Sequence, residues 1–148
     1  EDSERANKAE VELRAFELEF AQHLLTFRPG DAQLRLDLAR RHLRSGDHDT
    51  AISELQQVTS DPRVEREARF FLGQAFHAKG FPDLARKEFL KALQEGTRLD
   101  ERSKEILYNL ASIAEASGEV EEARSYYTRV FEVDISYRDV AQKMEGFK

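Results

Sequence analysis

The chain has 148 residues, of which 40% are hydrophobic and 35% are charged, and its net charge is −6. This length predicts one domain with a substantial core, and the acidic balance argues against nucleic acid, whose phosphates require a basic surface. No apolar run reaches the roughly 18 residues of a membrane helix, and the absence of cysteine excludes a disulfide framework and any thiolate chemistry.

The first predicted element is a long helix over residues 3–28. Apolar residues such as Phe16 and Leu24 cover a wide face of it, and Glu and Lys fill most of the remainder. Pro29 ends this helix, and Asp31 can cap the next one. Because the sequence begins with glutamate rather than methionine, we expect a shortened or processed product, whose compartment the sequence does not indicate.

The clearest unit is a pair of helices separated by Gly80, over residues 69–97. Their facing stripes consist of Leu72, Gly73 and Phe76 in the first helix and Ala85, Phe89 and Ala92 in the second. Two helix backbones approach closely only where side chains are small, as they are at Gly73 and Ala85. A bulkier side chain at Ala85 would overpack the crossing, at a cost of roughly 1–3 kcal/mol.

The same alternation of small and large residues occurs on both sides of this unit. The equivalent residues are Leu38, Ala39, His42, Ala51 and Leu55 upstream, and Leu110, Ala111, Ala114, Ala123 and Tyr127 downstream. Gly46 and Gly80 are 34 residues apart, whereas Gly80 and Gly118 are 38 apart, so we assign four extra residues to the polar stretch 97–104. Asp61-Pro62 is predicted to open the helix of the central unit. A last short helix is expected over residues 137–145.

The pattern L-G-x-x-F followed by A-x-x-x-F resembles the tetratricopeptide repeat, a helix–turn–helix unit of about 34 residues. The resemblance implies an all-α fold, a right-handed α-solenoid of tandem repeats with capping helices at both ends. The tail VFEVDISYRDVAQKMEGF resembles the C-terminal ends of bacterial proteins of this family. The chain is a divergent member, because the family's tryptophan position holds Arg35, Arg69 and Leu107.

These observations divide the single domain into five parts. They are an N-terminal helix or degenerate half-repeat at 1–30, repeats at 31–62, 63–98 and 99–135, and a C-terminal capping helix at 136–148.

In this family the first helix of each repeat lines a concave groove. The resemblance places Leu36, Phe70 and Tyr108 there as an apolar ladder, and adds Arg40, Arg44, Gln74, His77, Ser112 and Glu115 as further groove residues. We expect Arg40 and Arg44 to make one end of the groove basic and Glu105 and Glu115 to make the other end acidic. The alternatives are that the ladder only packs neighbouring first helices or lies under the N-terminal helix, and that the two arginines are solvated surface residues.

No residue pattern indicates catalysis, a metal site or a cofactor. None of the four histidines belongs to a metal-ligand motif, and His42 stands at a packing position. We therefore expect a non-catalytic adaptor that binds a segment of another protein in the groove, with no cofactor and no membrane insertion. Two alternatives stay open: a structural unit that forms homo-oligomers through its convex surface or its ends, and a regulatory module of a larger protein.

Overall fold

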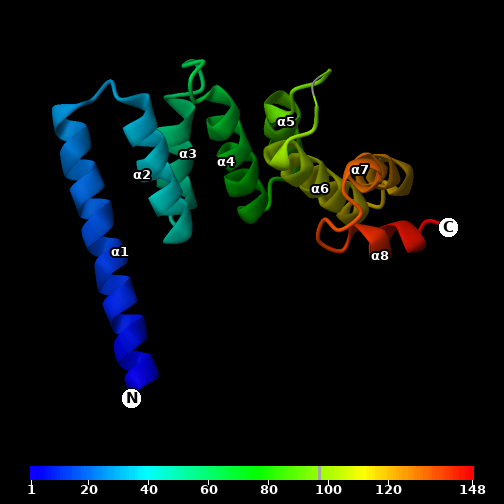
Figure 1. Ribbon diagram of the computed structural model, residues 1–148. Helices are drawn as coiled ribbons and strands as arrows, with labels where there is room; N and C mark the ends of the chain where they lie inside the picture. Colours follow the sequence, from blue (N-terminus) through cyan, green and yellow to red (C-terminus); the bar gives the residue numbers. More distant parts are fainter. Residues whose placement is uncertain (97) are drawn as a thin grey trace.

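A computed structural model describes residues 1–96 and 98–148; position 97, where the predicted insertion begins, lies outside the described residues. The described part contains eight α-helices and no strand. They are α1 (Asp2–Phe27), α2 (Ala32–Arg44), α3 (His48–Gln56), α4 (Glu65–Ala78), α5 (Pro82–Ala92), α6 (Glu101–Ala116), α7 (Val120–Val133) and α8 (Val140–Glu145). Figure 1 shows them as one row, with α1 at one end and α8 at the other. The architecture is the predicted all-α solenoid.

Three helical hairpins form the body of the row: α2 packs on α3, α4 on α5, and α6 on α7. Each hairpin turns at a glycine with a left-handed backbone, since φ is +82° at Gly46, +83° at Gly80 and +77° at Gly118. A side chain is strained in this conformation, whereas glycine adopts it freely. Glycine therefore recurs in the sequence because each hairpin turn requires this backbone conformation.

Aspartates cap several of these helices. The carboxylates of Asp31, Asp47 and Asp100 accept hydrogen bonds from the backbone N–H of the third residue beyond each, at 2.9, 3.2 and 2.8 Å. The prediction that Asp61-Pro62 opens the next helix was wrong, because α4 begins only at Glu65. Asp61 instead accepts hydrogen bonds from the side chain and backbone of Arg63, and these lower its pKa to about 2.

The core runs through all three hairpins and depends on small residues at the crossings. Ala39, Ala51, Ala85, Ala111 and Ala123 are all 0% exposed. The helices also approach closely at Gly73, where an added Cβ would lie only 2.6 Å from Cε1 of Phe89. No larger residue fits there without displacing the Phe89 ring.

The arginines at the family's tryptophan position have a specific role in the first two hairpins. Nη1 of Arg35 donates to Glu54 at 2.5 Å, and Nη1 of Arg69 donates to Glu88 at 3.0 Å. Both pairs join the two helices of one hairpin across the same 19-residue separation, and their side chains are largely buried. In these two hairpins a largely buried ion pair thus stands where the family has a tryptophan.

The two ends of the row differ. Helix α1 packs chiefly on α2, buries only Ala21, and extends beyond the ends of α2 and α3 in Figure 1. At the other end α8 begins at Val140 rather than at the expected position 137, because Arg138 has a left-handed backbone with φ of +43°. No helix in the described part of the chain has the length and apolar character needed to cross a bilayer.

Candidate protein-binding groove

The apolar ladder predicted for the groove is largely closed. Leu36 is 3% exposed and Phe70 is 1% exposed, so neither side chain is available to a partner. The Phe70 ring packs edge-on against Phe71, with centroids 5.2 Å apart, and against Phe89 at 5.9 Å. The assignment of Leu36 and Phe70 as exposed groove contacts was therefore wrong. They pack neighbouring helices together, which was the alternative that the sequence left open.

An arginine from the next repeat covers Phe70. The guanidinium carbon of Arg102 lies 3.9 Å from the centroid of the Phe70 ring. Two hydrogen bonds of 2.9 and 2.8 Å to Glu67 and one of 2.6 Å to Glu105 fix the guanidinium in this position. Sequence reasoning missed this contact because it assigned Arg102 to a polar insertion, whereas the residue lies in the first turn of α6.

The chain's own C-terminal segment occupies the third repeat's part of the predicted groove. Tyr108 donates a 2.6 Å hydrogen bond to Asp139, and Arg138 lies 4.8 Å above the Tyr108 ring. Burial, and then this hydrogen bond, raise the pKa of Tyr108 to about 12. Tyr108 is therefore engaged within the chain instead of presenting an open anchor.

The acidic end expected from Glu105 and Glu115 is neutralised. Glu115 accepts a 2.7 Å hydrogen bond from the Tyr127 hydroxyl and two of 3.0 Å from Lys143, and these partners lower its pKa. Glu105 binds Arg102 at 2.6 Å and lies 3.6 Å from Arg138. The prediction of an acidic end was therefore wrong. Cations from the C-terminal segment and from the start of α6 pair with these two glutamates.

The basic end of the predicted groove is exposed to solvent. Arg40 and Arg44 are exposed on α2, and neither forms an ion pair within residues 1–96 and 98–148. The Arg40 guanidinium lies 5.1 Å from the centroid of the Phe71 ring. On α4, His77 is exposed and Gln74 is partly buried; Ser112 on α6 is also partly buried.

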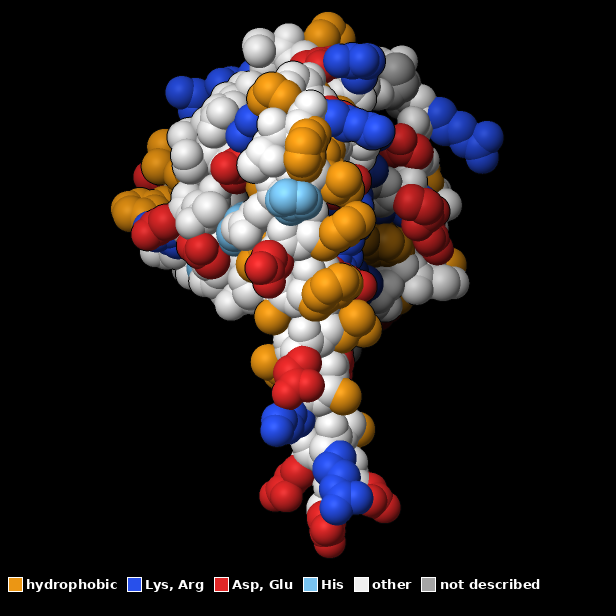
Figure 2. All heavy atoms as spheres, turned by 90° about the vertical axis from the view of Figure 1, so that its left-hand side faces the viewer, with side chains coloured by type: hydrophobic (Ala, Val, Ile, Leu, Met, Phe, Trp, Pro, Cys, Tyr) orange, Lys and Arg blue, Asp and Glu red, His pale blue; other side chains and the backbone are white. Residues whose placement is uncertain are grey.

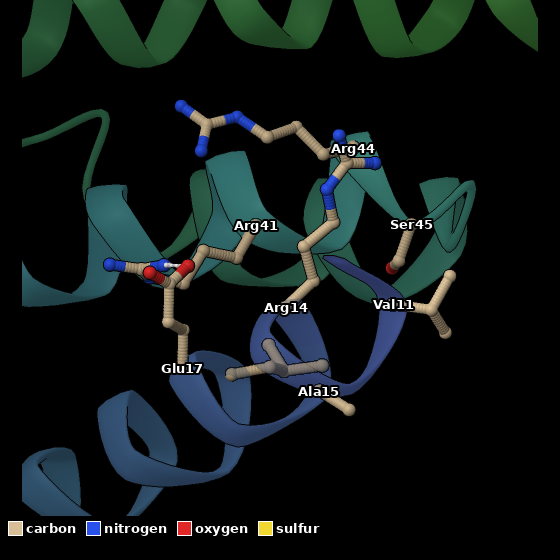
Figure 3. Close-up of a pocket in the computed structure, with 8 residues that line it drawn as sticks. Val11, Arg14, Ala15, Glu17, Arg41, Arg44 and Ser45 are labelled. Carbon is tan, nitrogen blue, oxygen red and sulfur yellow. Dashed lines mark hydrogen bonds and ion pairs between the residues drawn. The ribbon is translucent and has the colours of Figure 1, made fainter. Parts of the chain in front are cut away.

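A cleft between α1 and α2 adjoins this basic end (Figure 3). It has a volume of about 340 Å³ and an apolar wall of Val11, Ala15 and Leu18. Figure 3 shows Arg14 reaching from α1 toward α2, and Arg44 of α2 also lines the cleft. The full lining is Val11, Arg14, Ala15, Glu17, Leu18, Arg41, Arg44 and Ser45.

Four arginines line this cleft or a hollow next to it, and we call Arg14, Arg40, Arg41 and Arg44 the arginine cluster. A smaller hollow of about 90 Å³ is lined by Asp37, Arg40, Arg41 and Arg44, and it shares Arg41 and Arg44 with the cleft. Among the described residues, only two members have glutamate partners: Arg41 binds Glu17 at 2.7 Å, and Arg14 binds Glu10 within α1. The cluster carries excess positive charge although the whole chain is acidic.

The histidines do not assemble a metal site. His42 is 5% exposed in the core, and its Nδ1 lies 3.6 Å from Asp47 without a hydrogen bond. Among the described residues, no group of three or more His, Cys, Asp or Glu side chains is placed to hold a metal ion.

The repeat geometry agrees with comparisons to known proteins. A family model for the tetratricopeptide repeat matches residues 36–98 and 80–132, which together cover most of the chain. The chain belongs to the tetratricopeptide repeat family. Such repeats support a protein–protein interaction scaffold, and their fold is typical of non-catalytic interaction modules. No curated protein matches the chain.

Solved structures show the same repeat fold. One crystal structure of MamA aligns with a TM-score of 0.76 at 17% identity, over 97% of this chain and 74% of that one. A structure of MamA AMB-1 aligns with a TM-score of 0.65 at 26% identity, over 79% of this chain and 66% of that one. At these identities the likeness supports the arrangement of the tetratricopeptide repeats and does not specify a partner.

Proposed function

We propose that this tetratricopeptide repeat protein is a non-catalytic adaptor that binds an acidic segment of a partner protein at the arginine cluster. The observation that carries the proposal is the pair Arg40 and Arg44, which are exposed and lack an acidic partner in the described chain. The other charged groove residues, Glu105 and Glu115, already have partners within the chain.

The chemistry of the cluster selects the kind of segment. Guanidinium groups form paired hydrogen bonds with carboxylates and have a low hydration cost, which makes arginine a common anchor of protein interfaces. Arg40 and Arg44 lie one helical turn apart, so successive acidic side chains of a bound segment can reach both. Binding also relieves the repulsion among the arginines, and this favours an acidic segment over a neutral one.

The adjoining cleft adds an apolar requirement. Its wall of Val11, Ala15 and Leu18 lies directly beside Arg41 and Arg44. A volume of about 340 Å³ is at the lower end of the range for ligand pockets and accommodates a large apolar side chain. We therefore expect acidic residues flanking at least one bulky hydrophobic residue in the bound segment.

Affinity capture with charge-reversed variants tests the proposal. The protein is compared with Arg40→Glu/Arg44→Glu and with a control, Lys87→Glu/Arg124→Glu, that changes the net charge equally on exposed positions of α5 and α7. We expect one partner to be retained by the unmodified protein and the control but lost by the Arg40/Arg44 variant. Equal loss in both variants would show a general effect of charge, and equal retention would contradict the proposed site.

A further inference from the structure

The face of α1 that points away from α2 carries an uncovered apolar stripe. Leu13, Phe16, Phe20 and Phe27 are 56%, 65%, 54% and 71% exposed. In Figure 2, which turns the α1 end of the row toward the viewer, hydrophobic side chains gather along this helix. Monomeric proteins rarely expose so many large side chains side by side, and such patches mark interaction surfaces. We call these four residues the outer stripe.

The spacing of the outer stripe is that of a helix–helix seam. Its members follow one another at three, four and seven residues, and His23 fills the missing place between Phe20 and Phe27. From Leu13 to Phe27 the stripe is about 21 Å long, at 1.5 Å of rise per residue. The rings of Phe16 and Phe20 stack along it with centroids 6.4 Å apart. A second helix lying along α1 would contact every member of the stripe.

Acidic residues line both edges of the N-terminal half of the stripe. Going around the helix at about 100° per residue places Glu12 and Glu19 along one edge and Glu10 and Glu17 along the other. Glu19 has no ion-pair partner among residues 1–96 and 98–148, and Glu12 has only a distant one, Lys8, at 3.9 Å. A second copy of this stripe lying parallel to the first would bring glutamates against glutamates, which is unfavourable.

We infer that the outer stripe docks an amphipathic helix of a partner protein whose apolar seam is flanked by Lys and Arg. The seam supplies contacts for Phe16 and Phe20, and the cations pair with Glu12 and Glu19. This surface is separate from the arginine cluster, because Val11, Ala15 and Leu18 lie on the opposite side of α1. The protein would then join two partners of opposite charge, one at the arginine cluster on α2 and α1 and one at the outer face of α1.

Synthetic peptides provide the test. Two peptides of about two heptads share a leucine seam and carry either Lys or Glu at the flanking positions. Fluorescence anisotropy with the full chain is measured where each peptide is monomeric. We expect the Lys-flanked peptide to bind about tenfold more tightly than the Glu-flanked one, which corresponds to a few favourable exposed ion pairs.

Three variants separate the contributions. Phe16→Ser/Phe20→Ser should weaken binding of the Lys-flanked peptide at least about tenfold, while Leu84→Ser/Leu90→Ser, which removes similarly exposed side chains from α5, should not. Glu12→Lys/Glu19→Lys should reverse the preference toward the Glu-flanked peptide. All of these substitutions are at exposed positions, and circular dichroism verifies that each variant folds.

Several results would overturn the inference. Equal binding of both peptides, or binding that survives loss of Phe16 and Phe20, would show that this surface does not select a basic helix. A dimer of the unmodified protein in sedimentation experiments that dissociates in the phenylalanine variant would assign the stripe to a second copy instead. Arg40→Glu/Arg44→Glu should leave peptide binding unchanged, so the test does not depend on the proposed adaptor site.

Discussion

Replacing Gly73 by alanine tests a close helix crossing of the fold. An added Cβ would lie 2.6, 2.7 and 2.8 Å from three carbon atoms of the Phe89 ring. The ring cannot move away easily, because Phe89 is 1% exposed and packs against Phe70 at 5.9 Å. Alanine in a helix interior stabilises the fold by about 1 kcal/mol relative to glycine, whereas overpacking costs roughly 1–3 kcal/mol. We expect a net loss of up to about 2 kcal/mol.

A double-mutant cycle with Phe89→Leu isolates the cause. Urea unfolding followed by far-UV circular dichroism gives the free energy of unfolding of the parent, both single variants and the double variant. With the ring removed, Gly73→Ala should become neutral or stabilising by up to about 1 kcal/mol. If Gly73→Ala raises stability by the same amount in both backgrounds, the helices do not cross as closely as the structure indicates and the reasoning fails.

Three further predictions concern charge and the ends of the chain. Arg66 donates two hydrogen bonds to Asp100 and lowers the pKa of that carboxyl group. Because the folded state favours the ionised carboxylate, this ion pair stabilises the fold above about pH 4, and its contribution is lost as the pH falls further. Asp100→Asn keeps the helix cap, and its melting temperature should approach that of the parent below this pH; a constant difference would contradict the assignment. Arg102→Ala uncovers Phe70 and should cost about 1–2 kcal/mol in urea unfolding, while Arg102→Met should retain part of that stability. Deleting the residues after Ser136 removes buried Val140, so hydrogen exchange should accelerate first in α7, and uniform protection would refute this.

The fold followed from the sequence because its determinants are local and periodic. A helical hairpin must turn at a residue that tolerates positive φ, and the residues at its helix crossing must be small. Glycine therefore recurs at the turns, as at Gly80, and alanine at the crossings, as at Ala85, with the same offset in each repeat. The start of α4 was not predicted, since Asp61 binds Arg63 in a turn instead of capping the helix. Proline and aspartate favour both arrangements, and the local sequence does not distinguish them.

The proposed binding surface was only partly predictable. Helical periodicity identified Arg40 and Arg44, whose exposure depends on their own helix. It could not show that Arg102 covers Phe70 or that Lys143 pairs with Glu115, because these contacts join separate helices. The wide apolar face of α1 was likewise visible in the sequence, but only the structure separates the part that α2 covers from the exposed outer stripe.

Site-specific photo-crosslinking tests the central claim, that a partner segment binds on the side of the first helices next to the arginine cluster. A photoreactive residue replaces exposed His77 on α4 in one variant and exposed Leu90 on α5 in another. Mass spectrometry then identifies the captured partner and its crosslinked segment. The account predicts a crosslink from position 77 to a segment rich in Asp and Glu, and loss of that crosslink in the Arg40→Glu/Arg44→Glu background. A crosslink from position 90 alone, or one from position 77 that survives the charge reversal, would contradict it.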